Sequence, residues 1–325
     1  MAVYNFKSSS ITTGVTRKTI WDQVSTYLNP AGYTIGGYAG GNTATVNKLP
    51  FDTETFSVLG TGLSVARNYV CGYSSSTNGY AAGGYDGTTL GLTTVDKFSG
   101  SSDARTTLGT GLNLGRTGAG GVASSTNGYA INGRATDGSY RTSISKMAFS
   151  NDTFTTSAAT TGSNRNMGAS FYNSTNGYYP GGENSAGAYI SAIDKLNYSA
   201  DTISTLGTGL SNTASAPTGF SSSTAGYVAG GANGGGRHTT VNKFLFSDDS
   251  RTTLGTGLAT ATTGAFNNIN STTAGYYVGG NTAASAGGVT TAYKFTFSDD
   301  SRSTLSSAIA TAGYSDGGGG FSCLG

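Results

Sequence analysis

The chain has 325 residues, a formal net charge of +2 and only 10% charged residues. This near-neutral balance, with no basic cluster, argues against a nucleic-acid partner, and no stretch reaches the ~20 apolar residues that a membrane-spanning helix needs. The 53 glycines follow no Gly-X-Y period, which excludes collagen, and 36% apolar residues argue against disorder. Because turn and strand formers outweigh helix formers, we expect a soluble, all-β protein.

Residues 1–30 stand apart from the rest of the chain and predict an N-terminal extension. They lack the apolar run of a secretory signal peptide, so we expect synthesis in the cytoplasm. Residues 3–6 alternate like a strand that could add to a partner's sheet, and residues 19–28 place apolar side chains on one helical face before Asn29-Pro30. The extension either caps the fold or attaches it to an assembly. The attachment candidates are Tyr4, Phe6, Ile20, Trp21 and Val24.

From residue 31 onward the chain repeats. Gly-Tyr pairs recur at intervals of 47 or 49 residues, beginning at Gly32, Gly79, Gly128, Gly177, Gly226 and Gly275. A constant period of this length indicates an array of one supersecondary unit rather than a single irregular domain.

Each unit contains four short strand patterns separated by turn residues. In the second unit these are residues 69–73, 79–84, 93–98 and 105–108. Four antiparallel strands in about 49 residues make one blade of a β-propeller, so residues 31–325 predict a six-bladed propeller. The first unit lacks the strand that should precede Gly32. We expect residues 316–322, near the C-terminus, to supply that strand and close the ring.

The repeat resembles the kelch-type propeller repeat over residues ~31–325. The resemblance rests on the Gly-Gly pair after the second strand, an aromatic residue in the third (Phe98, Phe244, Phe295) and an apolar residue in the fourth (Leu59, Leu108, Leu206, Leu254, Leu305). Leu or Phe stands where the family has tryptophan in the fourth strand. The Thr-Leu-Gly-Thr-Gly-Leu phrase and the low charge also resemble repetitive propeller proteins of bacteriophage virions and tails, which implies a virion location.

Two kinds of side chain recur in every unit. One lysine per unit could form a ring that binds an anion, but strand alternation favours packing between blades or exposure to solvent. One tyrosine per unit could stack on sugar rings, but its place beside a glycine favours packing between blades. The lysines are Lys48, Lys97, Lys146, Lys195, Lys243 and Lys294. The tyrosines are Tyr33, Tyr80, Tyr129, Tyr178, Tyr227 and Tyr276.

Features that vary between units are the candidates for ligand contact. Arginine occupies one equivalent position in three units, where it suits acidic or hydroxylated ligands. The loop after the second strand differs in every unit, and such loops often carry specificity, although neutral drift explains the divergence equally well. The arginines are Arg67, Arg116 and Arg165. The loop candidates are Tyr38, Tyr85, Arg134, Glu183, Arg237, His238 and Asn281.

Catalytic chemistry finds little support in the sequence. The single histidine, His238, has no Cys or carboxylate at ligand spacing, so we expect no catalytic residue, metal or cofactor. Acids recur before the fourth strand, where Asp favours turns. These acids are Asp103, Asp152, Asp201, Asp249 and Asp300. Cys71 and Cys323 lie at non-equivalent positions, so no disulfide framework is indicated, and a single bridge between them stays open.

We therefore expect a non-enzymatic structural and recognition module of a virion, within a larger homo- or hetero-oligomer. It would contact a host-surface glycan or another virion protein, with no nucleic-acid partner and no membrane insertion. Two alternatives stay open. A carbohydrate-active enzyme would gather acids on one face, and a free lectin-like or scaffold propeller would bind no virion protein.

Overall fold

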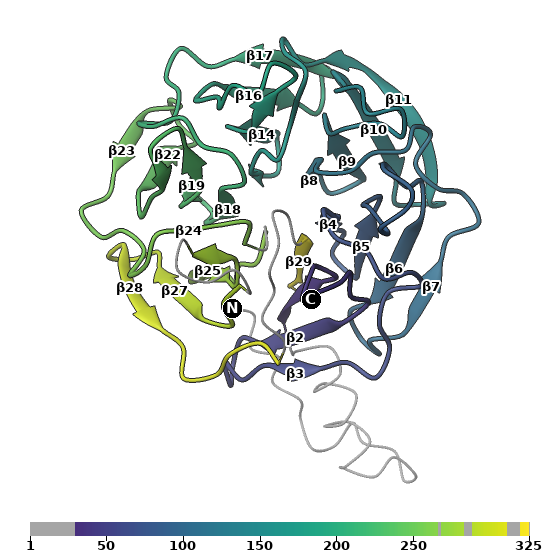
Figure 1. The fold of residues 1–325 in the computed structure, drawn as a ribbon, viewed down its shortest axis with the longest axis horizontal. Helices are drawn as coiled ribbons and strands as arrows, with labels where there is room; N and C mark the ends of the chain where they lie inside the picture. The colour runs from purple at the N-terminus through teal and green to yellow at the C-terminus, as the bar shows by residue number, and fades with distance from the viewer. Residues whose placement is uncertain (1–29, 266–267, 283–287, 311–318, 325) are drawn as a thin grey trace, which may run out of the picture.

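A computed structural model describes residues 30–265, 268–282, 288–310 and 319–324. Within these ranges every regular element is a β-strand, and the strands form six antiparallel blades around one axis (Figure 1). The chain is therefore an all-β, six-bladed β-propeller, as the period predicts. The strand and helix expected within residues 1–29 lie outside the described residues. The described part contains no helix with the length and apolarity that a membrane crossing requires.

Blades 1 to 3 each contain four strands, which follow one another from the axis outward. Blade 1 is built from β29 (Gly319–Cys323), β1 (Ala31–Ile35), β2 (Val46–Pro50) and β3 (Ser57–Val58). Blade 2 is built from β4 (Cys71–Ser74), β5 (Asn78–Ala82), β6 (Val95–Ser99) and β7 (Arg105–Thr107). Blade 3 is built from β8 (Gly120–Ala123), β9 (Asn127–Ile131), β10 (Ser143–Ala148) and β11 (Thr153–Thr160).

Blades 4 to 6 repeat this order. Blade 4 is built from β13 (Phe171–Tyr172), β14 (Asn176–Pro180), β16 (Ile193–Asn197) and β17 (Thr202–Thr205). Blade 5 is built from β18 (Thr218–Ser221), β19 (Ala225–Ala229), β22 (Val241–Leu245) and β23 (Arg251–Thr253). Blade 6 is built from β25 (Ala274–Val278), β27 (Ala292–Thr296) and β28 (Ser301–Thr304). Its innermost position is filled by residues 269–270, where Asn270 forms a single bridge with Gly275.

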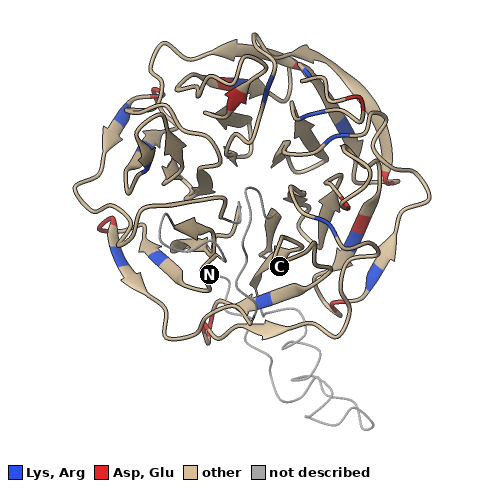
Figure 2. Ribbon diagram, viewed as in Figure 1, with Lys and Arg blue, Asp and Glu red and all other residues tan. Residues whose placement is uncertain are grey.

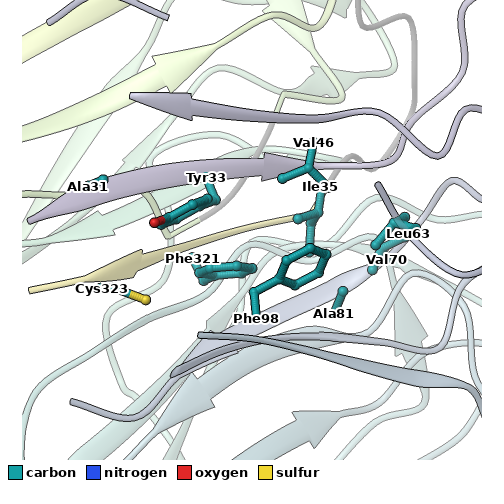
Figure 3. Close-up of a cluster of buried hydrophobic side chains, with 10 residues drawn as sticks. All are labelled: Ala31, Tyr33, Ile35, Val46, Leu63, Val70, Ala81, Phe98, Phe321 and Cys323. Carbon is teal, nitrogen blue, oxygen red and sulfur yellow. The ribbon is translucent and has the colours of Figure 1, made fainter. Parts of the chain in front are cut away.

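The C-terminal strand completes the first blade, as predicted. β29 pairs antiparallel with β1, with Ala31 opposite Cys323 and Ile35 opposite Gly319. Phe321 lies between Tyr33 and Phe98 (Figure 3), with ring centroids 4.9 Å and 6.1 Å away. The N-terminal and C-terminal strands therefore close the ring by sharing one sheet, in which β1 is paired on both sides.

The glycine of each Gly-Tyr pair makes room for the preceding blade. A Cβ at Gly79 would overlap the ring of Phe321 from blade 1, and a Cβ at Gly128 would overlap Tyr73 from blade 2. The same relation holds in all six blades, with Val122, Phe171, Phe220 and Ile269 filling the other four positions. An apolar side chain at the innermost position of each blade thus occupies the space that the next blade's glycine leaves empty.

The tyrosine of each Gly-Tyr pair is a core residue, which confirms the packing interpretation. All six are at most 1% exposed. Tyr178, for example, stacks on Phe171 of its own blade and on Phe246 of the next, with centroids 4.6 Å and 5.6 Å apart. The repeated aromatic rings therefore bind blade to blade.

Each repeated lysine contacts an acid of the next blade, at distances from 2.6 to 3.8 Å. The pairs are Lys48–Asp103, Lys97–Asp152, Lys146–Asp201, Lys195–Asp249, Lys243–Asp300 and Lys294–Glu54. Opposite charges accordingly recur around the whole ring (Figure 2). All six acids have φ between 51° and 57°, in the turn between third and fourth strands. In five blades the repeated tyrosine and the repeated lysine share one acid of the next blade. The tyrosine hydroxyl donates a hydrogen bond to the same carboxylate that the lysine contacts.

The propeller has two faces that differ in their connections. Because neighbouring strands are antiparallel, first-to-second and third-to-fourth turns emerge on one face, which we call the turn face. Second-to-third loops and the links between blades emerge on the opposite face, the loop face. Ala31 and Cys323 sit where a first-to-second turn would be, so the chain enters and leaves blade 1 on the turn face.

Candidate functional site: an axial cavity and a loop face

A cavity of ≈ 560 Å³ opens on the turn face around the propeller axis. It is lined by the first-to-second turns of blades 2 to 6 and, in the sector of blade 1, by Ser322 and Leu324. Serine, threonine and asparagine supply most of the lining, and the described residues around it include no Asp, Glu, Lys, Arg or His. The cavity therefore suits a neutral ligand.

A local hydrogen-bond pattern builds each turn of this lining. In blade 2 the Ser75 hydroxyl accepts the backbone N–H of Asn78 at 3.0 Å, and in blade 4 the side-chain oxygen of Asn173 accepts the N–H of Asn176 at 2.8 Å. Such side-chain-to-backbone bonds stabilise tight turns without a glycine. They leave the following side chain at the exposed tip of the turn. These tip residues are Ser76, Ser125, Ser174, Ser223 and Thr272.

One side chain breaks the symmetry of the lining. Tyr172 in blade 4 stands at the position that holds Ser74, Ala123, Ser221 and Asn270 in other blades. Burial raises the pKa of Tyr172, so its phenol is neutral at pH 7. The cavity consequently combines an uncharged aromatic wall with a ring of small hydroxyl groups.

On the loop-face side of the cavity, the amide of Asn268 lies across the axis and donates to the carbonyl of Gly121 and, at 3.0 Å, to the hydroxyl of Ser170. Further along the axis, Gly118, Met167 and Ala216 form a chain of backbone hydrogen bonds from blade to blade at 2.8–3.0 Å. The void among these residues is ≈ 20 Å³, about the space of one water molecule. Asn268 and these residues thus lie on the loop-face side of the cavity.

The loop candidates form a ring on the loop face. The backbones of Tyr85 and Arg134 pair with residues that precede the first strand of their own blades. Glu183 and Asn281 do the same in short two-stranded pairs, β12–β15 and β24–β26. Tyr38 bridges Asn42 within its own loop. The short strands on this face are β12 (Arg165–Asn166), β15 (Glu183–Asn184), β20 (Ala232–Asn233), β21 (Gly236–Arg237), β24 (Thr262–Thr263) and β26 (Asn281–Thr282).

Hydrogen bonds between neighbouring loops hold this ring in place. The Asn42 amide donates to the carbonyl of Tyr85 at 2.9 Å, and Arg237 donates to the side chain of Asn281 at 2.8 Å. Burial lowers the pKa of His238, so its ring is neutral at pH 7. No group of three or more His, Cys, Asp or Glu among the described residues is placed to hold a metal ion. The loop face thus offers ordered aromatic, amide and arginine groups.

The three periodic arginines lie inside the fold, each at most 1% exposed. Arg67 contacts Asp96 at 3.0 Å, and Arg165 contacts Asp194. Arg116 has no carboxylate within ion-pair distance in the described part of the chain. It donates instead to the carbonyls of Ala130, Asn132 and Ser143 and to the hydroxyl of Ser145. Burial lowers the pKa of Arg116 to about 10. We therefore propose no ligand contact for these arginines.

The two cysteines are free and buried, so the alternative of a bridge between them is not realised. Cys323 packs with Tyr33 and Phe321, whereas Cys71 packs in a separate cluster with Tyr73. Burial raises the pKa of each thiol to about 12. Both side chains are therefore small apolar core groups.

Comparison with known families and with curated proteins finds no match for this chain. Sequence reasoning also missed the axial cavity, because it treated the first-to-second turns as connections only. The available signal was the substitution of Tyr172 into an otherwise small-residue position of the repeat. Function is therefore inferred from the geometry of the two faces.

Proposed function

We propose that this chain is a non-enzymatic structural and recognition module, carried as a tail or capsid appendage of a bacteriophage virion. In this proposal its loop face contacts a host-surface glycan or another virion protein. The observation that carries the proposal is the separation of the two faces. The chain enters blade 1 at Ala31 and leaves it at Cys323 on the turn face, and the divergent second-to-third loops lie on the opposite face.

This separation suits a tethered binder. Residues 1–29 join the propeller at Ala31 on the turn face, so a tether through them would leave the loop face free for contact. The interblade bonds described above pre-organise the loops, which lowers the entropy cost of binding. Arg134 stacks over Tyr140 at 5.7 Å, which adds a planar, partly exposed surface of the kind that recognition sites use.

The contacts of the acids favour binding over glycoside hydrolysis. A glycosidase needs two carboxyl groups that face each other across a substrate. The six turn acids each contact a lysine of the preceding blade, and Asp96 and Asp194 are buried against arginines. These eight acids serve the fold. On the loop face, Asp86 and Asp137 accept backbone N–H groups of their own turns, from Thr88, Thr89 and Ser139, and Glu183 is the third acid described there. The contacts of the eight fold acids support a recognition role.

The test is a host-cell and glycan-array binding assay with the full chain, a chain lacking residues 1–29, and a Tyr85→Ala/Arg134→Ala variant. Binding should survive the truncation and be lost in the double variant. The matched control is Ser150→Ala, an exposed outer-turn residue on the turn face. Binding that persists in the double variant would overturn the role of the loop face. No binding of the full chain to cells, glycans or virion proteins would overturn the recognition role.

A further inference from the structure

The axial cavity has the dimensions of a small-molecule site. Its volume of ≈ 560 Å³ lies within the range of roughly 300–1,000 Å³ that ligand pockets occupy. It is lined by the turns of the turn face, and on its loop-face side Asn268 lies across the axis. A ligand could therefore enter along the axis and meet groups from all six blades.

The hydroxyl groups at the turn tips are available for hydrogen bonds. The side chains of Ser76, Ser125, Ser174, Ser223 and Thr272 make no hydrogen bond within the described residues. Each hydroxyl can both donate and accept, so the ring can match hydroxyl groups in many orientations. The absence of charged residues from the described lining disfavours phosphate, carboxylate and ammonium ligands.

Apolar surface stands on two sides of this hydroxyl ring. Tyr172 supplies an aromatic side chain from blade 4, and Leu324, 42% exposed, supplies an aliphatic one in the sector of blade 1. A ligand with hydroxyl groups on its edges and C–H groups on its faces matches this combination. Tyrosine and serine are also the residues that recognition surfaces use for rigid contact area and adaptable hydrogen bonding.

We propose that the axial cavity is a binding site for a neutral saccharide, with Tyr172 as its apolar wall and the turn-tip hydroxyls as its hydrogen-bonding groups. This site is separate from the loop face and does not depend on the virion role. The asymmetry at Tyr172 gives the site one preferred orientation of the sugar, although the surrounding turns are near-equivalent.

The experiment uses the full chain and a panel of neutral probes: glucose, galactose, mannose, N-acetylglucosamine and their disaccharides. Saturation-transfer NMR detects binding, and titration gives the dissociation constant. Tyr172→Ser places at this position the residue found at Ser74 and Ser221, so the backbone should tolerate it. Because the Tyr172 ring also packs against two core clusters, the melting temperature of this variant is measured beside its binding. Ser125→Trp fills the cavity from an exposed turn tip. Its matched control is Ser204→Trp, on the exposed outer strand β17.

At least one probe should bind saturably to the full chain. Tyr172→Ser should weaken that binding about tenfold, which corresponds to about 1.4 kcal/mol, and Ser125→Trp should abolish it. Ser204→Trp should bind like the parent chain, and circular dichroism should show all variants folded. The proposal is overturned if no probe binds, or if Ser125→Trp binds normally. Loss of sugar binding in the Tyr85→Ala/Arg134→Ala variant alone would also overturn it and would assign the sugar to the loop face.

Discussion

The glycine of each Gly-Tyr pair is required because a side chain of the preceding blade packs against it. Its backbone conformation does not require glycine. The Gly-Tyr glycines are absent from the set with positive φ. What excludes a side chain at Gly79 is the ring of Phe321, which comes from the other end of the chain. The period of the glycines is therefore the period of the interblade contact.

Replacement of Gly79 by alanine should destabilise the fold by about 1–3 kcal/mol, because the added methyl group would force Phe321 from its place. Gly109→Ala is the matched control, since a Cβ there meets no atom within 4 Å. Denaturant unfolding would measure both variants. Equal stability of the two would show that Phe321 moves without cost and that the contact does not set the repeat.

Asp96 is a second residue whose role follows from its partners. Burial by itself raises the pKa of Asp96, but the backbone N–H of Ser64, the hydroxyl of Thr107 and Arg67 outweigh it, and the net pKa is lowered. A lowered pKa in the folded state adds stability above the ordinary value of about 3.9. That stability is lost as the pH falls below this value and through the folded pKa.

Asp96→Asn should cost about 3–5 kcal/mol at pH 7, because it leaves the buried Arg67 without its counter-charge. The difference from the parent should shrink below pH 4 in pH-dependent unfolding. Blade 5 carries Ala214 and Asn242 at these two positions, and Asn242 accepts the N–H of Ser211 as Asp96 accepts that of Ser64. Arg67→Ala/Asp96→Asn should therefore be more stable than Asp96→Asn. A double variant that is less stable would contradict the charge explanation.

At the scale of elements, β29 is the strand whose loss has the largest expected effect. Deletion of residues 316–325 should lower the melting temperature sharply, because it removes Phe321 from the core and exposes the inner edge of β1. Loss of the Phe321 side chain alone would cost about 3–5 kcal/mol. A chain that ends at Cys323 is the control and should melt like the parent. Unchanged melting of the longer deletion would rule out closure by β29.

Repetition made most elements predictable. Strands, blade number and closure by the C-terminal segment all follow from aligning one unit on the next. Elements that depart from the average unit were not predictable. Glu54 fills the turn position held by Asp in five blades, and only the contact with Lys294 reveals the equivalence. The short pairs on the loop face, such as β20 with β21, have no strand pattern because backbone pairing across loops creates them.

At the scale of the whole molecule, blade 1 is distinguished among the described residues by its missing first-to-second turn. Ala31 and Cys323 face each other as Asn78 and Ser75 do in blade 2, where Ser76-Thr77 joins them. The axial cavity is likewise a property of the whole ring. A cavity formed by turns from five blades has no local sequence pattern, since its members are a full period apart.

A circularly permuted chain should therefore fold. In this variant Cys323 is joined to Ala31 through Ser-Thr, and new ends are placed between Ser223 and Thr224. Circular dichroism should match the parent, and the melting temperature should lie within a few degrees, because every blade keeps its strands. The control is the unpermuted chain of residues 30–324. If the permuted chain failed to fold while the control folded, the ring could not be closed at blade 5 in place of blade 1.

The pairing of the two ends also decides how the ring responds to mechanical load. Ala31 and Cys323 lie at the same end of adjacent antiparallel strands, so a force that pulls the termini apart would open their hydrogen bonds one pair after another, like a zipper. A force applied through the N-terminal segment alone runs along β1, which is paired over five residues on each side with β29 and β2. Those bonds are then loaded together in shear. A propeller anchored by its N-terminus alone would resist detachment far better than one pulled by both ends.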